Sequence, residues 1–337
     1  MESSFWRGRP VLVTGATGLL GGWLVKKLLE EGADVVALVR DRCPKSLLER
    51  EGLLSRLTVV QGDLRDAALV RRSLGEYSIA TIFHLAAQTL VGVAKDDPAG
   101  TLDVNIRGTW TVLEAARQAG APQIIVASSD KAYGAQPGLP YVETHPLQGR
   151  YPYDVSKSCT DLICGMYATT YQLPVTVARC ANLFGGGDLN FSRLIPGLIQ
   201  STIKGDPFLI RSDGKFLRGY LYVKDAANAY TILARTLAER PELSGEAFNF
   251  GMDGCATVIE IVDKVLRLMG REDLQPILQN IANNEIREQY LSSEKAARLL
   301  AWRPLYSLQE ALSETIEWYR EFFAPSAAPL LSASMQV

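Results

Sequence analysis

A glycine-rich turn close to the N-terminus constrains the fold of this chain more than any other feature. The apolar, β-branched run from Pro10 to Thr14 is typical of a buried strand, and Gly15-Ala-Thr-Gly-Leu-Leu-Gly21 follows it directly. Glycines here permit a tight turn, close approach of the backbone to a pyrophosphate, and close packing of the next helix on the strand. We therefore expect a dinucleotide site formed by Gly15, Thr17, Gly18, Leu19, Leu20 and Gly21. The alternative is a tight strand-to-helix turn that binds no ligand.

Strands and helices alternate after this turn. Further apolar runs predict strands at 34–39, 57–61, 81–85, 123–127 and 174–178. Segments with helical periodicity lie between these strands, at 23–31, 67–74, 98–119 and 153–171. Such alternation indicates parallel strands joined by right-handed crossovers. The sequence therefore predicts an α/β fold with a Rossmann-type doubly wound parallel sheet.

The pattern changes after residue 180, where helical spacing dominates. We expect a dinucleotide-binding Rossmann domain at 1–180, which residues 219–250 rejoin. A smaller, mostly helical substrate-binding lobe would comprise 181–218 and 251–323. Residues 324–337, rich in proline and small residues, have the composition of a disordered tail.

Composition narrows the possible functions. The chain has 35 Lys and Arg against 37 Asp and Glu and no basic run, which argues against nucleic-acid binding. With only His84 and His145, a histidine-based metal site or hydrolase triad is nearly excluded, and we expect no metal. Five cysteines without a CxxC pair are typical of reduced thiols. No signal peptide or membrane-spanning stretch is evident, so we expect a cytoplasmic location and no membrane partner.

Two segments bear on the choice of cofactor. Asp63 and Leu64 end the predicted third strand, where the carboxylate can accept from an adenine amino group and the leucine can pack on the ring. A helix N-cap is the alternative role for Asp63. After the second strand, Arg40 suits the 2′-phosphate of NADP, whereas Asp41 suits the ribose hydroxyl of NAD. These residues leave both cofactors open.

A Tyr-Lys pair supplies candidate chemistry. Tyr153 and Lys157 are four residues apart on a predicted helix, so the phenol and the ammonium share one face. A neighbouring ammonium lowers the pKa of a phenol, and we expect Tyr153 to act as a general base near neutral pH. Ser129, at the end of the preceding strand, can hold a substrate hydroxyl against the phenol.

Together these motifs resemble the extended short-chain dehydrogenase/reductase superfamily, the NAD-dependent epimerases and dehydratases that act on nucleotide sugars. The resemblance covers residues 5–322. It rests on Gly15–Gly21, Asp63-Leu64, His84–Ala87, Asn105–Thr109, Ser129, Tyr153 with Lys157, Arg179–Asn182, Arg218–Val223 and Phe248–Gly251. Within the superfamily, Ser129-Asp130-Lys131, Gly185–Asp188 and Ile195-Pro196 are most similar to the CDP-glucose 4,6-dehydratases.

The resemblance implies a set of functional residues. The catalytic residues would be Ser129, Asp130, Lys131, Tyr153 and Lys157, with Asp130 the acid for the C6 hydroxyl of the sugar and Lys131 the base at C5. The cofactor would contact Arg40, Asp63, Leu64, Leu85, Ala86, Ala87, Gln88, Asn105, Tyr153 and Lys157 besides the glycine turn. The substrate would contact Gln88, Ser129, Asn182, Arg193, Arg211, Arg218 and Arg287.

The resemblance also implies partners and an activity. NAD would be tightly bound, with NADP kept open by Arg40, and the substrate would be a nucleotide-diphosphate sugar. A homodimer would form through a four-helix bundle whose faces carry Trp110, Leu113, Leu162, Met166 and Tyr167. The implied enzyme is a nucleotide-sugar 4,6-dehydratase, which oxidises C4 transiently, eliminates water across C5 and C6, and returns hydride to C6. The alternatives are a 4-epimerase, then an NADP-dependent reductase or a decarboxylase, then a non-catalytic dinucleotide sensor.

Overall fold

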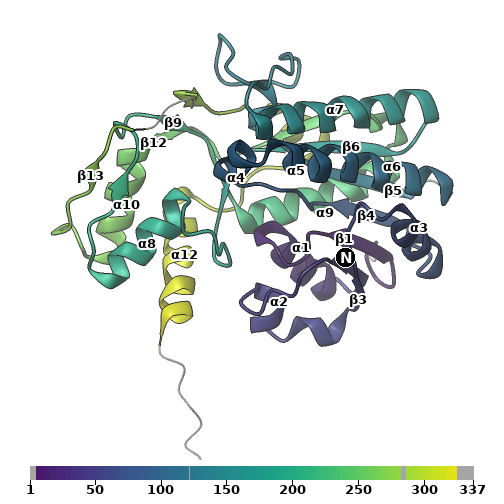
Figure 1. Ribbon diagram of the computed structural model, residues 1–337, viewed down its shortest axis with the longest axis horizontal. Helices are drawn as coiled ribbons and strands as arrows, with labels where there is room; N and C mark the ends of the chain where they lie inside the picture. Colours follow the sequence, from purple (N-terminus) through teal and green to yellow (C-terminus); the bar gives the residue numbers. More distant parts are fainter. Residues whose placement is uncertain (1–4, 121, 282–285, 325–337) are drawn as a thin grey trace, which may run out of the picture.

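A seven-stranded, all-parallel sheet forms the centre of the protein (Figure 1). The computed structural model describes residues 5–120, 122–281 and 286–324, so the tail expected at 324–337 lies outside the described residues from residue 325 onward. The strands are β1 (Pro10–Thr14), β2 (Asp34–Val39), β3 (Thr58–Gln61), β4 (Thr81–His84), β5 (Gln123–Ser129), β6 (Val175–Cys180) and β11 (Ala247–Phe250). The predicted fold class is confirmed.

The strand order reverses between β1 and β4. The sheet runs β11-β6-β5-β4-β1-β2-β3, so the chain leaves β1 toward one edge and returns to continue toward the other. The crossovers on the two sides diverge at this point, and ligands of open α/β sheets bind there, beyond the carboxyl ends of the strands. The glycine turn after β1 therefore lies where a dinucleotide is expected.

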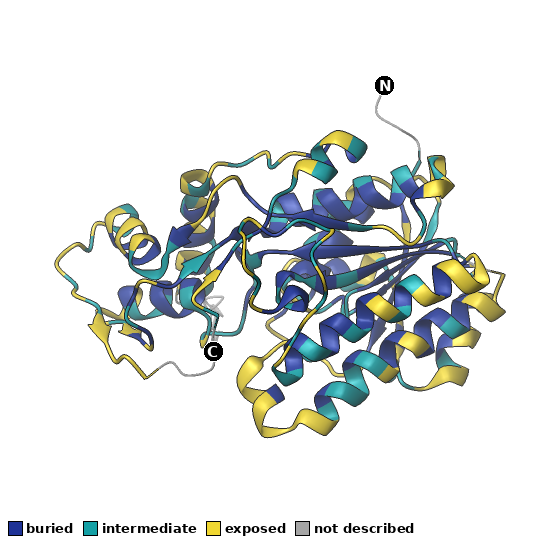
Figure 2. Ribbon diagram, turned by 90° about the horizontal axis from the view of Figure 1, so that it is seen from above, coloured by how far each residue is buried: buried dark blue, intermediate teal, exposed yellow. Residues whose placement is uncertain are grey.

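Helices cover both faces of the sheet, and the buried strands lie between them (Figure 2). One face carries α1 (Leu19–Glu30) and α9 (Val223–Glu239); the other carries α3 (Ala67–Glu76), α6 (Gly108–Gln118) and α7 (Pro152–Tyr171). Successive residues of β1 enter different cores, because Val11 and Val13 pack toward α1 whereas Leu12 packs toward α3. Burial on both faces explains why the strands read as continuous apolar runs.

The rest of the chain forms small sheets and further helices. Short strands pair as β7 (Asn182–Phe184) with β10 (Tyr220–Tyr222), β8 (Leu209–Ile210) with β13 (Ile277–Leu278), and β9 (Leu217–Arg218) with β12 (Ala256–Thr257) and β14 (Glu288–Gln289). The helices are α2 (Leu47–Arg50), α4 (Val91–Asp96), α5 (Pro98–Leu102), α8 (Leu194–Lys204), α10 (Val258–Met269), α11 (Glu294–Leu300) and α12 (Leu308–Phe323). Single 3₁₀ turns occupy Leu53–Arg56, Asp130–Tyr133 and Pro241–Leu243. Within 219–250, β11 pairs with β6 of the main sheet while β10 does not; the division into two domains stays a prediction.

The helix expected at 98–119 is interrupted. A π-helical turn at Asp103–Arg107 separates α5 from α6. Turns of this kind are common at functional sites. Here the turn contains Asn105, whose buried side chain bonds the segment after β4.

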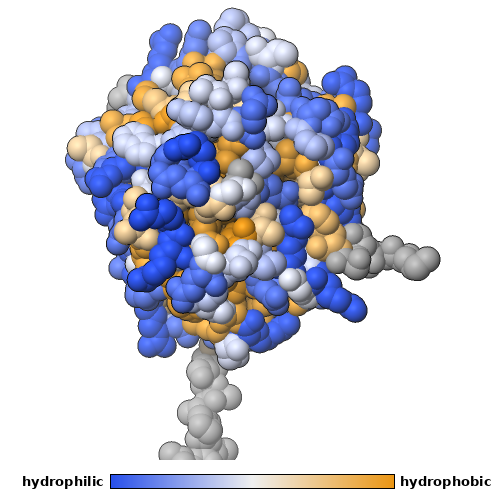
Figure 3. All heavy atoms as spheres, turned by 90° about the vertical axis from the view of Figure 1, so that its right-hand side faces the viewer, coloured by the Kyte–Doolittle hydropathy of each residue, from blue (hydrophilic) through white to orange (hydrophobic). Residues whose placement is uncertain are grey.

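Surface polarity varies over short distances. Figure 3 shows apolar side chains in small groups between hydrophilic ones on the face seen from the right of Figure 1. Among the described residues, no helix is both long and apolar enough to span a bilayer.

Packing at the glycine turn generates a stability prediction. A methyl group at Gly21 would lie 2.1 Å from the carbonyl oxygen of Gly15, a backbone atom that cannot move aside freely. Gly21→Ala should therefore lower the free energy of unfolding by roughly 1–3 kcal/mol, measured by chemical denaturation. Gly75→Ala in α3 is the matched control, because nothing lies within 4 Å of its added methyl, and it should be neutral or stabilising. Equal losses in both variants would contradict this account.

Candidate active site

The glycine turn after β1 has the geometry of an anion cradle. Gly15 has φ +73°, and a Cβ there would lie 2.8 Å from the amide nitrogen of Ala86. The first turn of α1, beginning at Leu19, has neither a capping side chain nor an acidic residue. Its backbone N–H groups and positive dipole end therefore suit a pyrophosphate. The residues present fit a dinucleotide at the predicted turn.

A chain of buried hydrogen bonds ties the ends of β1 and β4 together. The Thr14 hydroxyl accepts the N–H groups of Leu85 and Ala86, each at 3.2 Å, and donates to His84 Nδ1 at 2.9 Å. His84 Nε2 therefore carries the proton, which it donates to Thr109 at 3.1 Å. The Thr109 hydroxyl in turn donates to the carbonyl of Asn105. Burial lowers the pKa of His84 to about 3, assisted by the charge of Lys157, so the imidazole stays neutral.

Asn105 fastens the other end of the loop after β4. Its Oδ1 accepts the N–H of Gln88 at 2.7 Å, while its Nδ2 donates to the carbonyl of Gln88 and to Ser156, both at 2.9 Å. Ser156 belongs to α7, the helix that bears Tyr153. The Gln88 side chain bonds Thr101 and Leu90. Asn105 therefore acts on the predicted cofactor segment Leu85–Gln88 through its backbone.

The residues predicted near the adenosine half of the cofactor lie at the ends of β2 and β3. Arg65 engages both carboxylate oxygens of Asp63 and holds the pKa of that carboxyl down at about 2. Leu64 packs over Gly108 of α6. The exposed Arg40 pairs with its neighbour Asp41 at 2.5 Å. Asp63 therefore carries its negative charge at neutral pH.

Ser129, Tyr153 and Lys157 meet beyond the end of β5. The Ser129 hydroxyl lies close enough to the phenol of Tyr153 to act on its pKa, and Lys157 Nζ lies 5.9 Å from the centre of the phenol ring. Lys157 donates to the carbonyl of Ala127 at 2.8 Å, and burial lowers its pKa to about 8. The three residues thus form one cluster, as the sequence predicts.

The expected effect of Lys157 on the phenol is wrong for this structure. Burial raises the pKa of Tyr153 above its usual value, because the phenolate would lose its hydration. The groups that oppose this rise are the Arg193 guanidinium and the Ser129 hydroxyl, not Lys157, whose ammonium is turned to the main chain.

Asp130 and Lys131 follow directly in a 3₁₀ turn. Asp130 is 1% exposed, and burial raises the pKa of its carboxyl, which favours the protonated acid. Its Oδ1 accepts from Ser129 at 3.0 Å. Lys131 Nζ donates to Gln289 Oε1 at 2.9 Å. Burial raises the pKa of Asp154, the residue after Tyr153, to about 6. Asp130 adds to this rise and Lys131 opposes it.

Three of the predicted substrate-binding arginines fall into two groups. Arg193 pairs with Asp188 at 2.9 Å and reaches Thr89 on the loop after β4, near Tyr153. Arg218 and Arg287 instead both lie against the Phe216 ring, 5.2 and 5.7 Å from its centre.

Two further predicted residues are not part of either group. Asn182 donates to the carbonyl of Gly219 at 3.0 Å, and Arg211 is exposed in the segment after β8. Arg193 acts on the pKa of Tyr153 and Arg218 on that of Asp130, so two of the four predicted arginines lie near the cluster.

Sequence reasoning missed the residues that support the cluster from behind. Asp161 pairs with Arg179 at 2.7 Å, both nearly fully buried, and accepts from Ser128. Arg179 also donates to the hydroxyl of Tyr133 at 2.8 Å. Asp161 follows Lys157 by four residues and shares its helix face, which was the one available signal.

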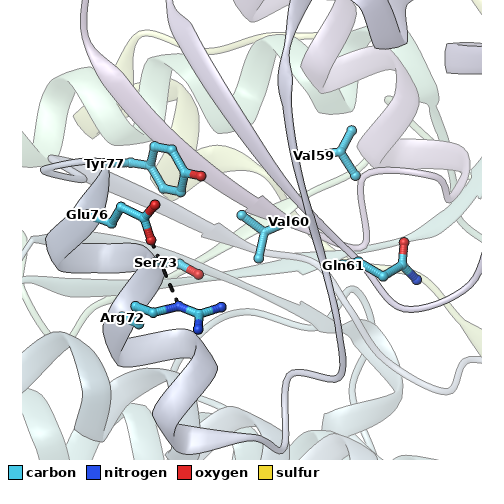
Figure 4. Close-up of a pocket in the computed structure, with 7 residues that line it drawn as sticks. All are labelled: Val59, Val60, Gln61, Arg72, Ser73, Glu76 and Tyr77. Carbon is cyan, nitrogen blue, oxygen red and sulfur yellow. Dashed lines mark ion pairs between the residues drawn. The ribbon is translucent and has the colours of Figure 1, made fainter.

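A separate surface cavity lies at the sheet edge (Figure 4). It has a volume of about 390 Å³ and lies between β3 and α3, lined by Val59, Val60, Gln61, Arg72, Ser73, Glu76 and Tyr77. Its charged side chains, Arg72 and Glu76, pair with each other at 3.9 Å. None of the residues of the Ser129–Lys157 cluster lines it, so it is not the candidate site.

The histidine network makes stability depend on pH. Between pH of about 6.5 and about 3, the unfolded chain binds a proton at His84 that the folded chain does not. The free energy of unfolding therefore decreases as the pH is lowered through this range. His84→Gln should be less stable at neutral pH by roughly 1–3 kcal/mol but should lose less on acidification. Denaturation at several pH values measures this. His145→Gln is the control and should keep the acid-dependent loss; an unchanged loss in His84→Gln would refute the assignment.

The comparisons with known proteins agree with this geometry. The model of the NAD dependent epimerase/dehydratase family matches residues 11–251. The chain is 31% identical to a CDP-glucose 4,6-dehydratase of Salmonella typhimurium, with 95% of this chain and 93% of that protein covered. It is 30% identical to a UDP-glucose 4-epimerase of Mycolicibacterium smegmatis, with 92% and 98% covered.

The similar solved structures also include a 4,6-dehydratase and a 4-epimerase. A dTDP-glucose 4,6-dehydratase of Streptomyces venezuelae, solved with NAD, has a TM-score of 0.83 at 28% identity, covering 93% of this chain and 97% of that one. A UDP-glucose 4-epimerase of Thermotoga maritima, solved with UDP-glucose, has a TM-score of 0.84 at 26% identity, covering 93% and 99%. The predicted resemblance is confirmed: this chain belongs to the NAD-dependent epimerase/dehydratase family.

Proposed function

We propose that this enzyme is a nucleotide-sugar 4,6-dehydratase that converts a nucleotide-diphosphate hexose into its 4-keto-6-deoxy product. The observation that carries the proposal is the Asp130-Lys131 pair beside Tyr153: a buried carboxyl that favours its protonated form, next to an amine. Elimination of water needs both an acid and a base at adjacent carbons. The similarity to a CDP-glucose 4,6-dehydratase supports the same assignment.

The proposed cofactor is NAD, held at the glycine turn, Asp63 and the Leu85–Gln88 segment. When bound, the oxidised nicotinamide supplies a hydride acceptor and a positive charge. The relatives solved with NAD support this choice. Arg40 is already paired with Asp41, which weakens its suitability for the 2′-phosphate of NADP. Tight binding of NAD and weak binding of NADP in calorimetry would agree with the proposal.

In the first half of the reaction, the residues of the phenol cluster handle the C4 hydroxyl. Ser129 would hold that hydroxyl, and Tyr153 would take its proton. Arg193 and Ser129 favour the phenolate against the effect of burial. Lys157 positions the cluster through its bond to the carbonyl of Ala127.

In the second half, the 4-keto group acidifies the proton on C5. Lys131 would remove that proton, and Asp130 would protonate the departing C6 hydroxyl. The burial of Asp130 suits this role, because it raises the pKa of the carboxyl and so favours the protonated form that can donate.

A 4-epimerase remains the second candidate because of one observation. Relatives with that activity match the chain over almost its whole length, and Tyr153 with Ser129 meets the needs of both reactions. An epimerase has no use for an acid and a base at C5 and C6, so Asp130 and Lys131 would then serve only in binding.

We also propose a homodimer formed by the helices around Asn105 and Tyr153. Trp110, Leu162 and Met166 are 46%, 63% and 44% exposed and would meet the partner. Leu113 and Tyr167, expected on the same face, lie instead in the core under α3, α6 and α7, because α6 and α7 turn them toward the sheet.

Leu162→Glu tests the dimer. A charge at this exposed apolar position should shift the sedimentation coefficient to that of a monomer, whereas Leu305→Glu, at a leucine that is 72% exposed and lies outside the proposed interface, should not. A wild-type chain that sediments as a monomer would refute the proposal.

The activity is tested with CDP-, GDP-, UDP- and dTDP-glucose in separate incubations, followed by mass spectrometry. We expect one of them to yield a product lighter by one water, without added reductant. Lys131→Ala should slow water loss by roughly 10²–10⁴-fold, because proton removal from C5 loses its base. Lys95→Ala, at an exposed lysine of α4, is the matched control. An isomer of unchanged mass would instead establish epimerisation.

A further inference from the structure

Two unsatisfied polar atoms lie next to Lys131. In the described part of the chain, buried side-chain atoms without a hydrogen-bond partner are Asp130 Oδ2, Gln289 Nε2, Thr176 Oγ1 and Trp302 Nε1. Asp130 is the residue before Lys131, and Gln289 accepts a hydrogen bond from Lys131 Nζ. Buried polar atoms are nearly always paired, so two orphans on side chains that adjoin Lys131 need an explanation.

The contact with Lys131 determines how the Gln289 amide is oriented. Its Oε1 accepts from Lys131 Nζ at 2.9 Å. With Oε1 turned to Lys131, Nε2 is the amide atom left without a partner. The backbone of Gln289 is held by β9, where the N–H of Gly219 donates to its carbonyl at 2.9 Å. Gln289 is 0% exposed and so has little room to turn elsewhere.

A hydroxyl oxygen would satisfy both orphans. It can accept from the Gln289 amide and exchange a hydrogen bond with the Asp130 carboxyl. In the proposed reaction Asp130 acts at the C6 oxygen and Lys131 at C5. An atom that borders both residues therefore lies at the C5–C6 end of the sugar.

We propose that Gln289 is a further substrate-contacting residue, which donates from Nε2 to the oxygen that leaves C6 and fixes Lys131 through Oε1. This inference rests on the proposed dehydratase function. In the step, the C5 proton passes to the neutral Lys131 amine and its electron pair forms the C5–C6 double bond. The C6–O bond breaks, and the oxygen takes the Asp130 proton and leaves as water. Gln289 keeps its protons and stabilises the charge that develops on the oxygen.

The role is confined to elimination. Oxidation at C4 depends on Ser129 and Tyr153, whereas Gln289 contacts Lys131. Loss of the Nε2 donor should therefore spare the first half of the reaction. A residue with a merely structural role would weaken both halves together.

The test uses the full-length enzyme with CDP-glucose, or with whichever of the four nucleotide-glucose substrates the wild type dehydrates. Three readouts are followed: build-up of reduced nicotinamide, deuterium uptake at C5 from heavy water, and loss of water by mass. Gln289→Leu removes both contacts. Gln289→Glu keeps an acceptor for Lys131 and removes the donor, and Gln309→Leu, at an exposed glutamine of α12, is the matched control.

Both Gln289 variants should form reduced nicotinamide as fast as the wild type but lose water roughly 10²-fold more slowly, so that the reduced form accumulates. Gln289→Glu should fold even where Gln289→Leu does not. An equal decline in all three readouts would overturn the proposal in favour of a structural role, and unchanged water loss would overturn it outright. A wild type that dehydrates none of the four substrates would refute the proposed function itself, and this inference with it.

Discussion

The site depends on the buried hydrogen bonds that join the ends of β1 and β4. Thr14 uses its one proton on His84 and its lone pairs on the amides of Leu85 and Ala86, so the loop after β4 is fixed to the end of β1. His84 extends the chain to Thr109, and thereby to the π-helical turn that holds Asn105. Because Thr109 gives its one proton to the carbonyl of Asn105, the hydrogen bonds run in one direction along the network. The network lies where the strand order reverses, between β1 and β4.

Burial determines the charge states of the residues around Ser129, Tyr153 and Lys157. It lowers the pKa of Lys157 to about 8 and raises that of the Asp130 carboxyl, so both residues are drawn toward their neutral forms. The buried pair of Arg179 and Asp161 compensates charge behind the cluster, because a lone buried charge is costly. The same helix, α7, carries Tyr153, Lys157 and Asp161 on adjoining turns.

Local sequence patterns predicted the residues that act within one segment. The glycine turn, Ser129-Asp130-Lys131 and the Tyr153–Lys157 spacing each lie on one element or at its end, and the parallel sheet brings those ends together. Residues whose partners are distant in sequence had no such signal. Gln289 lies on a two-residue strand, 158 positions from Lys131, and a strand that short has no periodicity.

Errors in the sequence interpretation share a physical cause. Helical spacing gave the right helices for Leu113 and Tyr167 but could not tell which apolar residues face the sheet and which face outward. It also could not reveal the π-helical turn at Asp103–Arg107, because the residues of such a turn have no distinctive sequence pattern. The pKa of Tyr153 depends on how completely the fold removes water, which spacing along one helix does not report.

Intramolecular transfer of the hydrogen on C4 tests the central claim most directly. CDP-glucose carrying deuterium at C4 is incubated with the enzyme, and the position of the label in the product is determined by NMR. The account predicts a 4-keto-6-deoxy sugar with the deuterium on C6, because oxidation, elimination and reduction occur in one site without release of the cofactor. Deuterium retained on an inverted C4, in a product of unchanged oxygen content, would contradict the dehydratase assignment and leave Asp130 and Lys131 without a role in proton transfer.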